Sequence, residues 1–289
     1  GALFLARVDK LLDLGALEPA KSLIEQASPD TLPLFRRWFD VALLTGTEDD
    51  ACTAMRETPS IAPTYPARIF CLARNGDCAA AALALNTHRV LGDISPDEEA
   101  LLIRFLDPEL FEGEPALRPP SRVSPLTFRM HEAIGEPLIT ANLPLAFSHA
   151  DLRFTTAWKS QLEAAERLAR YGAVSENVLL KHYTARTPAA SGGIWDRAEA
   201  IQRFDVAMIA RDPRSISATL PDAWAAMQAA RAEIQFAALY GDTLQDLPLT
   251  NDAAVIAFQM GLLSSDYEGI AIEAAQTQSG FDPFLIAVA

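Results

Sequence analysis

The sequence predicts an all-α protein, built as a helical-hairpin repeat array of the α-solenoid type with a second helical region behind it. Two observations support this prediction. Half of the residues are hydrophobic, and Ala and Leu dominate over Val, Ile and Thr. That bias favours helix over strand. The second observation is a unit that recurs at a nearly fixed interval in the first third of the chain.

The recurring unit is clearest over residues 65–85, which read as a helix, a tight Asn75-Gly76-Asp77 turn and a second helix. A glycine in a left-handed conformation is a common way to end a helix. Gly15 and Gly46 occupy the same place in two earlier stretches, so the turn glycines are 31 and then 30 residues apart. A small residue follows each glycine by five positions and lets the second helix approach the first: Ala20, Ala51 and Ala81. Such a period is typical of stacked helical hairpins, and a chance alignment of unrelated hairpins is the alternative.

The unit resembles a tetratricopeptide-type helix-turn-helix repeat over roughly the first third of the chain. It is shorter than the about 34 residues usual in that family. The family's full Trp/Leu-Gly/Tyr pattern is absent. The resemblance therefore implies a TPR-like architecture and no particular ligand.

A proline-rich stretch suggests how the chain is divided. Residues 113–125 contain four prolines, which must interrupt regular structure. We therefore expect a hairpin repeat region over residues 1–112, a linker or crossover over 113–127, and a C-terminal helical region over 128–289. Residues 135–151 are apolar for a non-helical segment, so we expect Leu143, Leu145 and Phe147 to pack against another part of the protein.

Glycines, prolines and capping residues divide the chain into helices. Ser95, Pro96 and Glu98 form the pattern of a capped helix start, and Pro221 is expected to separate two short helices. Asp151 is expected to cap a long amphipathic helix. The predicted helices cover residues 2–14, 17–27, 33–44, 48–57, 66–74, 77–91, 95–106, 124–134, 151–171, 175–186, 194–210, 222–230, 232–240, 251–263 and 265–275.

The three cysteines are Cys52, Cys71 and Cys78, and the hairpin register predicts which of them pair. In a stacked array, the second helix of one hairpin packs antiparallel to the first helix of the next. Cys52 lies six residues after its turn glycine and Cys71 lies five before its own, an offset of only ~1.5 Å along the axis. Cys78 lies ~6 Å away from Cys52 in the same direction. We expect a Cys52–Cys71 disulfide, formed in an oxidising compartment, with three reduced thiols in a cytoplasm as the alternative.

Charge and hydropathy exclude several classes of partner. The net charge is −14 and the pI about 4.7, which argues against nucleic acid and anionic membrane surfaces. No stretch reaches the ~18 apolar residues of a membrane span. The chain starts without Met inside an apolar helix, so we expect that a signal peptide has been removed.

We expect no catalytic residue, no metal site and no cofactor. The four histidines show no HExxH or related ligand spacing. Ser148, His149 and Asp151 are sequence neighbours and cannot form a nucleophile–base–orienter relay.

One loop is a candidate site for a ligand or a partner. Ser191, Gly192 and Gly193 precede a helix and could offer backbone N–H groups to an anion. Trp195 and Arg197 follow, and both residue types often anchor interfaces. The alternative is a flexible turn that only begins the helix.

The segments LPLAFSHADLR, PAASGGIWDR and LARNGD (residues 143–153, 188–197 and 72–77) carry a second resemblance, which spans most of the chain. They are similar to an uncharacterised helical family of alphaproteobacterial genomes, some of whose members are labelled "antifreeze glycopeptide polyprotein". The resemblance implies an exported, envelope-associated protein and supplies no catalytic residues. The label itself finds no support, because no Ala-Ala-Thr repeat is present.

These observations predict a non-catalytic protein-binding or scaffolding module of the cell envelope that uses a concave helical surface. We expect it to be periplasmic or otherwise exported, with a cytoplasmic adaptor as the alternative. A second hypothesis is a glycan- or small-ligand-binding protein that uses residues 191–197. A third is the helical support region of a larger enzyme.

Overall fold

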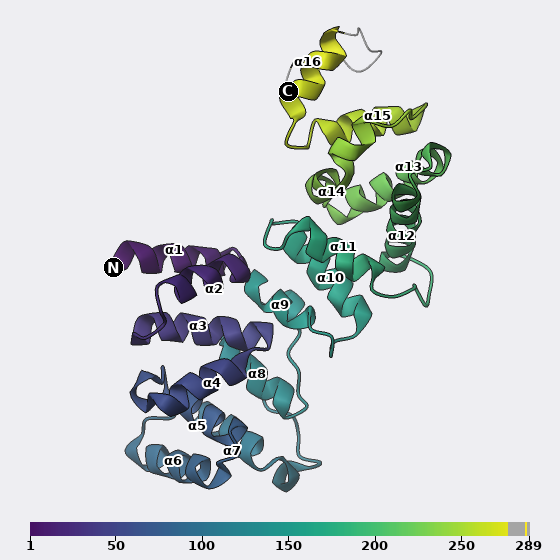
Figure 1. The fold of residues 1–289 in the computed structure, drawn as a ribbon. Coiled ribbons are helices and arrows are strands. Elements are labelled where there is room, and N and C mark those ends of the chain that lie inside the picture. The colour runs from purple at the N-terminus through teal and green to yellow at the C-terminus, as the bar shows by residue number, and fades with distance from the viewer. Residues whose placement is uncertain (277–286, 288–289) are drawn as a thin grey trace. The chain divides into compact units, whose positions relative to one another are not determined.

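The computed structural model describes residues 1–276 and residue 287, and over these residues the protein is all-α (Figure 1). Sixteen α-helices and four short 3₁₀ helices, without a strand, make up the described part of the chain. The chain forms two compact units, residues 1–153 and residues 154–289. The proline-rich stretch 113–125 therefore lies within the first unit.

The first seven helices form a hairpin stack, in which each helix packs on the one that follows it. Figure 1 shows them one after another in the first unit. Their bounds agree with the predicted ranges to within one residue at either end: α1 (Ala2–Asp13), α2 (Leu17–Gln26), α3 (Leu32–Thr45), α4 (Glu48–Glu57), α5 (Tyr65–Arg74), α6 (Cys78–Leu91) and α7 (Pro96–Leu106).

The recurring unit has the conformation that the sequence predicts. Gly15, Gly46 and Gly76 all have positive φ, between +72° and +83°. The alanines five positions later are completely buried: Ala20, Ala51 and Ala81. A small side chain is therefore needed where the second helix of each pair meets its neighbours.

This packing leads to a test of the unit. Replacing Ala81 with leucine should lower the free energy of unfolding by about 1–3 kcal/mol, because the added atoms enter a closed contact. The matched control is Ala79→Leu on the exposed side of the same helix, which should have little effect. Urea unfolding of both variants measures the difference, and equal stabilities would contradict the close approach of α5 and α6.

The rest of the first unit turns back onto the hairpin stack. After η2 (Pro108–Phe111) and the proline-rich stretch, α8 (Pro125–Ala133) packs on both α3 and α7. The elements η3 (Thr140–Asn142), η4 (Leu145–Phe147) and α9 (Ser148–Asp151) follow, and α9 also contacts α3. We call residues 113–153 the crossover segment.

The crossover segment shares a hydrophobic core with the hairpin stack. Phe128 and Phe147 pack with Leu17, Val41 and Leu44 of helices α2 and α3. Their two rings meet edge to face, 5.5 Å apart between centroids. Leu143 joins this cluster, so the prediction that the apolar loop packs against the protein is confirmed.

The second unit is also built from helices that pack pairwise, most extensively α12 on α13 and α14 on α15. Its described helices are α10 (Trp158–Ala169), α11 (Glu176–Thr184), α12 (Ile194–Ala210), α13 (Pro213–Ala230), α14 (Glu233–Gln245), α15 (Asp252–Gly261) and α16 (Tyr267–Gln276). No helix in the described part of the chain is long and apolar enough to cross a membrane.

Two predicted boundaries, near residues 151 and 221, are wrong, and α14 continues to Gln245, beyond its predicted end at residue 240. The helix expected from residue 151 starts at Trp158, and Asp151 instead ends the short helix α9 and accepts a hydrogen bond from the Thr140 hydroxyl. Helix α13 continues through Pro221 without a break. Buried side chains on both sides, including Leu220 and Trp224, hold this helix together despite the missing backbone hydrogen bond.

Candidate functional site

A cavity of about 240 Å³ lies in the first unit, between the hairpin stack and α8. Four segments line it: the middle of α3, the beginning of α5, the beginning of α7, and α8. It is thus a consequence of the way α8 packs across α3 and α7. The sequence prediction did not include this site, because its walls come from segments far apart in the chain.

The floor of the cavity is apolar and its mouth is polar. Buried side chains form the floor: Phe39, Pro66, Ala67, Leu101, Leu102 and Met130. Exposed side chains stand at the mouth: Arg36, Thr64, Glu98 and Ser124. A cavity with apolar walls and few polar groups is the usual form of a binding site.

Asp40 is the polar group between floor and mouth. It is half-buried, and its carboxylate makes no hydrogen bond or ion pair with any residue that the structure describes. Burial raises the pKa of Asp40 to about 6, although the nearby positive charges of Arg36 and Arg37 oppose the shift. Arg37 is held by Asp9 in a two-bond ion pair.

The other acidic residue of the cavity is already engaged. Glu98 accepts a hydrogen bond from the Ser95 hydroxyl, at 2.7 Å, and one from the Ser95 backbone N–H, at 3.0 Å. The backbone bond, together with the one that the Glu98 N–H donates to the Ser95 hydroxyl, forms the capping box that the sequence predicts at the start of α7. Asp40 is therefore the carboxylate of the cavity that has no hydrogen-bond partner among the described residues.

The raised pKa of Asp40 predicts a cost to stability that depends on pH. Because the folded-state pKa is about 6 and the ordinary pKa of an aspartate is 3.8, the folded protein disfavours the ionised form. The cost is full above pH 6, shrinks as the pH falls from about 6 to 3.8, and is absent below that. We expect Asp40→Asn to stabilise the protein by about 1–3 kcal/mol at pH 7.5 and by almost nothing at pH 4.

Urea unfolding at several pH values measures this effect. The matched control is Asp50→Asn on the exposed surface of α4, whose difference from the parent protein should not follow the same pH profile. A destabilised Asp40→Asn protein at pH 7.5 would contradict the unpaired state of the carboxylate.

A chain of ion pairs fixes α8, and with it one wall of the cavity. The Arg129 guanidinium of α8 donates to the Glu48 carboxylate of α4 at 2.6 Å, and the Glu48 side chain is only 3% exposed. Arg129 also pairs with Glu132, which in turn accepts hydrogen bonds from Arg153. Arg74 of α5 approaches Glu48 to 3.5 Å. These contacts connect the crossover segment to the second and third hairpins.

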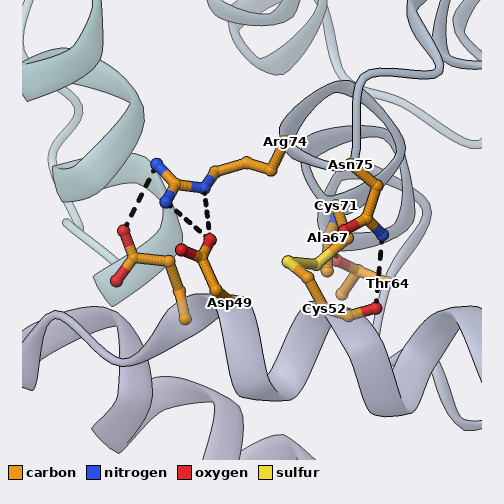
Figure 2. The surroundings of a disulfide bond; sticks show 8 residues. Asp49, Cys52, Thr64, Ala67, Cys71, Arg74 and Asn75 are labelled. Atoms are coloured by element: carbon orange, nitrogen blue, oxygen red, sulfur yellow. Dashed lines mark hydrogen bonds and ion pairs between the residues drawn. A yellow bond between two sulfur atoms is a disulfide. The ribbon is translucent and has the colours of Figure 1, made fainter.

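Figure 2 shows the disulfide that joins those same hairpins. Cys52 of α4 and Cys71 of α5 are bonded, with 4.9 Å between their Cα atoms, and Cys78 is free and exposed. This is the pair that the hairpin register predicts. Beside the disulfide, Arg74 donates two hydrogen bonds to Asp49 (Figure 2).

The loop proposed from the sequence lies in the second unit. Ser191, Gly192 and Gly193 are exposed, and both glycines have positive φ. The Gly192 N–H donates to the carboxylate of Asp196, at 2.7 Å. Gly193 is the N-terminal cap residue of α12.

Two side chains that follow this loop have partners inside the unit. The Arg197 guanidinium donates to both oxygens of Glu166, at 2.9 and 2.8 Å. The ring of Trp195 lies 5.2 Å from that of Trp158. The Tyr183 hydroxyl also donates to Glu166, and burial together with that carboxylate raises the pKa of Tyr183 well above its ordinary value. These contacts provide the buried Glu166 carboxylate with hydrogen-bond donors and a positive charge, as is usual for a buried charge.

Three of the four histidines are buried and have structural surroundings. His149 is buried and contacts the Gly15 carbonyl through Nε2, at 2.6 Å, which ties α9 to the first turn of the hairpin stack. Burial lowers the pKa of His149, His131 and His182. Among residues 1–276 and 287, no group of three His, Cys, Asp or Glu side chains is placed to hold a metal ion.

No local signal in the sequence marks Asp40, which lies one turn after Arg36 on α3. The spacing of four residues places Arg36 and Asp40 on one face of α3, but the partial burial of Asp40 depends on α7 and α8. Comparison of the chain with protein-family models, with curated proteins and with solved structures gives no match.

Proposed function

We propose that the protein is a non-catalytic protein-binding or scaffolding module whose contact surface is the mouth of the Asp40 cavity. The observation that carries this proposal is a free carboxylate held, at a cost to stability, in an apolar cavity of the hairpin stack. Groups that reduce stability without an internal partner are typical of functional sites.

The arrangement of helices supports a protein partner in particular. Helix α8 already packs across α3 and α7, so this side of the hairpin stack accepts helical segments in the manner of helix-in-groove recognition. The alternative site at Ser191–Arg197 receives less support, because Trp195 and Arg197 are engaged within their own unit. The acidic net charge of −14 makes a nucleic-acid partner the weaker proposal.

We place the protein in the periplasm or another oxidising compartment. The disulfide between Cys52 and Cys71 is compatible with export, since such bonds persist in oxidising environments. A non-reducing peptide map of protein isolated from its native host tests this placement. A linked Cys52–Cys71 peptide supports it, and three free thiols would leave a cytoplasmic adaptor.

Site-specific photo-cross-linking in the native host tests the contact surface. A photoreactive residue in place of Arg36 stands at the cavity mouth, and the matched control replaces Leu83, which is 69% exposed on α6 and does not line the cavity. We expect one discrete adduct with a protein from position 36 and none from position 83. Equal adducts from both positions, or none from either, would contradict the proposed surface.

A further inference from the structure

We propose that the Asp40 cavity receives a lysine side chain of the partner protein, with its ammonium group on the Asp40 carboxylate. This inference rests on the proposed function and specifies the chemistry of the partner. It follows from the shape of the cavity, from the charges around it and from the compact size of an ammonium group.

The cavity offers each part of a lysine side chain a suitable surface. Its floor of Phe39, Leu102 and Met130 is apolar and more than nine-tenths buried, which suits the four-carbon stem. Asp40 offers two acceptor oxygens to which no described residue donates a hydrogen bond, and an ammonium group carries three donors. The ion pair would remove the cost of an unpaired charge in a poorly solvated place.

The charges facing Asp40 come from two of the four lining segments. Arg36 and Arg37 lie on α3, and Glu98 lies on α7. The residues of α5 and α8 that line the cavity are uncharged. Arg37 is paired with Asp9, and Arg36 is exposed at the mouth, where solvent screens it from the floor. The net charge of −14 adds a general attraction for a basic partner.

A lysine fits better than an arginine for a geometric reason. One carboxylate in a cavity of about 240 Å³ matches the compact ammonium group. A planar guanidinium binds best where a carboxylate is approached edge-on and its remaining N–H groups also find acceptors. The other acidic residue, Glu98, already accepts two hydrogen bonds from Ser95 through one of its oxygens, Oε2.

The test uses the full chain and a lysine residue with amide groups on both sides, Nα-acetyl-lysine N-methylamide. The protein has five methionines, and Met130 lies on the cavity floor. The methyl groups of the methionines are labelled with ¹³C, and the protein is titrated with the lysine amide at pH 7.5. We expect the Met130 resonance to shift, and the resonances of the other four methionines to stay unchanged. The resonance is assigned with Met130→Leu.

Variants and pH then test the role of Asp40. Asp40→Asn should weaken binding at least tenfold, and Asp50→Asn should leave it unchanged. In the parent protein, binding should weaken as the pH falls through about 6, where Asp40 gains a proton. Since Asp40→Asn is expected to be more stable than the parent protein, loss of binding cannot be attributed to unfolding.

Several results would overturn the inference. They are an unshifted Met130 resonance, equal binding by Asp40→Asn, equal binding of the Nε-acetylated probe, or tighter binding of the corresponding arginine amide. Tighter binding of n-butylammonium than of the lysine amide would assign the cavity to a free amine instead of a partner's side chain. If the adduct at position 36 forms equally well in Asp40→Asn, the protein-binding function stands and the lysine inference falls.

Discussion

Replacing Arg129 with methionine is expected to lower the free energy of unfolding by about 3 kcal/mol. The change leaves the buried Glu48 carboxylate with Arg74 alone, at 3.5 Å, and breaking a buried ion pair by removing one partner is strongly destabilising. Helix α8 should also lose its hold on α4. Urea unfolding measures the first effect, and hydrogen exchange of the α8 amides measures the second.

The matched control is Arg122→Met, because Arg122 is exposed in the proline-rich stretch ahead of the same helix. It should change stability little. The double variant Glu48→Leu/Arg129→Met should recover part of the loss, since it no longer buries an uncompensated charge. If Arg129→Met and Arg122→Met are equally stable, the ion pair does not hold α8 in place.

Reducing the disulfide is expected to destabilise the first unit by about 3 kcal/mol. Cys52 and Cys71 are 19 residues apart, and opening a loop of this length returns conformational entropy to the unfolded chain. Hydrogen exchange with and without a thiol reductant should show faster opening of α4 and α5. The Cys52→Ala/Cys71→Ala protein should be insensitive to the reductant.

Two comparisons keep this result specific. Cys78→Ser should behave as the parent protein does, because Cys78 is free and exposed. Amides of the second unit should not respond to the reductant. Equal effects in both units would show that the reductant acts on something other than this disulfide.

Features that depend on neighbouring residues or on neighbouring hairpins could be predicted from the amino-acid sequence. Left-handed turn glycines, small buried alanines and the capping box at Ser95 are all local, so their patterns could be identified without coordinates. The disulfide could be predicted for the same reason. Its two cysteines lie on successive helices, and the repeat fixes their heights relative to each other.

The position of the crossover segment, and the cavity that it helps to enclose, depend on long-range packing that no local pattern reveals. Glu48 and Arg129 are 81 residues apart, and no local pattern links them. Asp40 becomes a half-buried carboxylate, with no hydrogen-bond partner among the described residues, because α7 and α8 pack around it. Helix α13 likewise continues through Pro221 because packing on both sides outweighs one missing hydrogen bond. Local sequence sets which segments become helices, whereas the burial of a charge depends on the free energy of all the segments that pack around it.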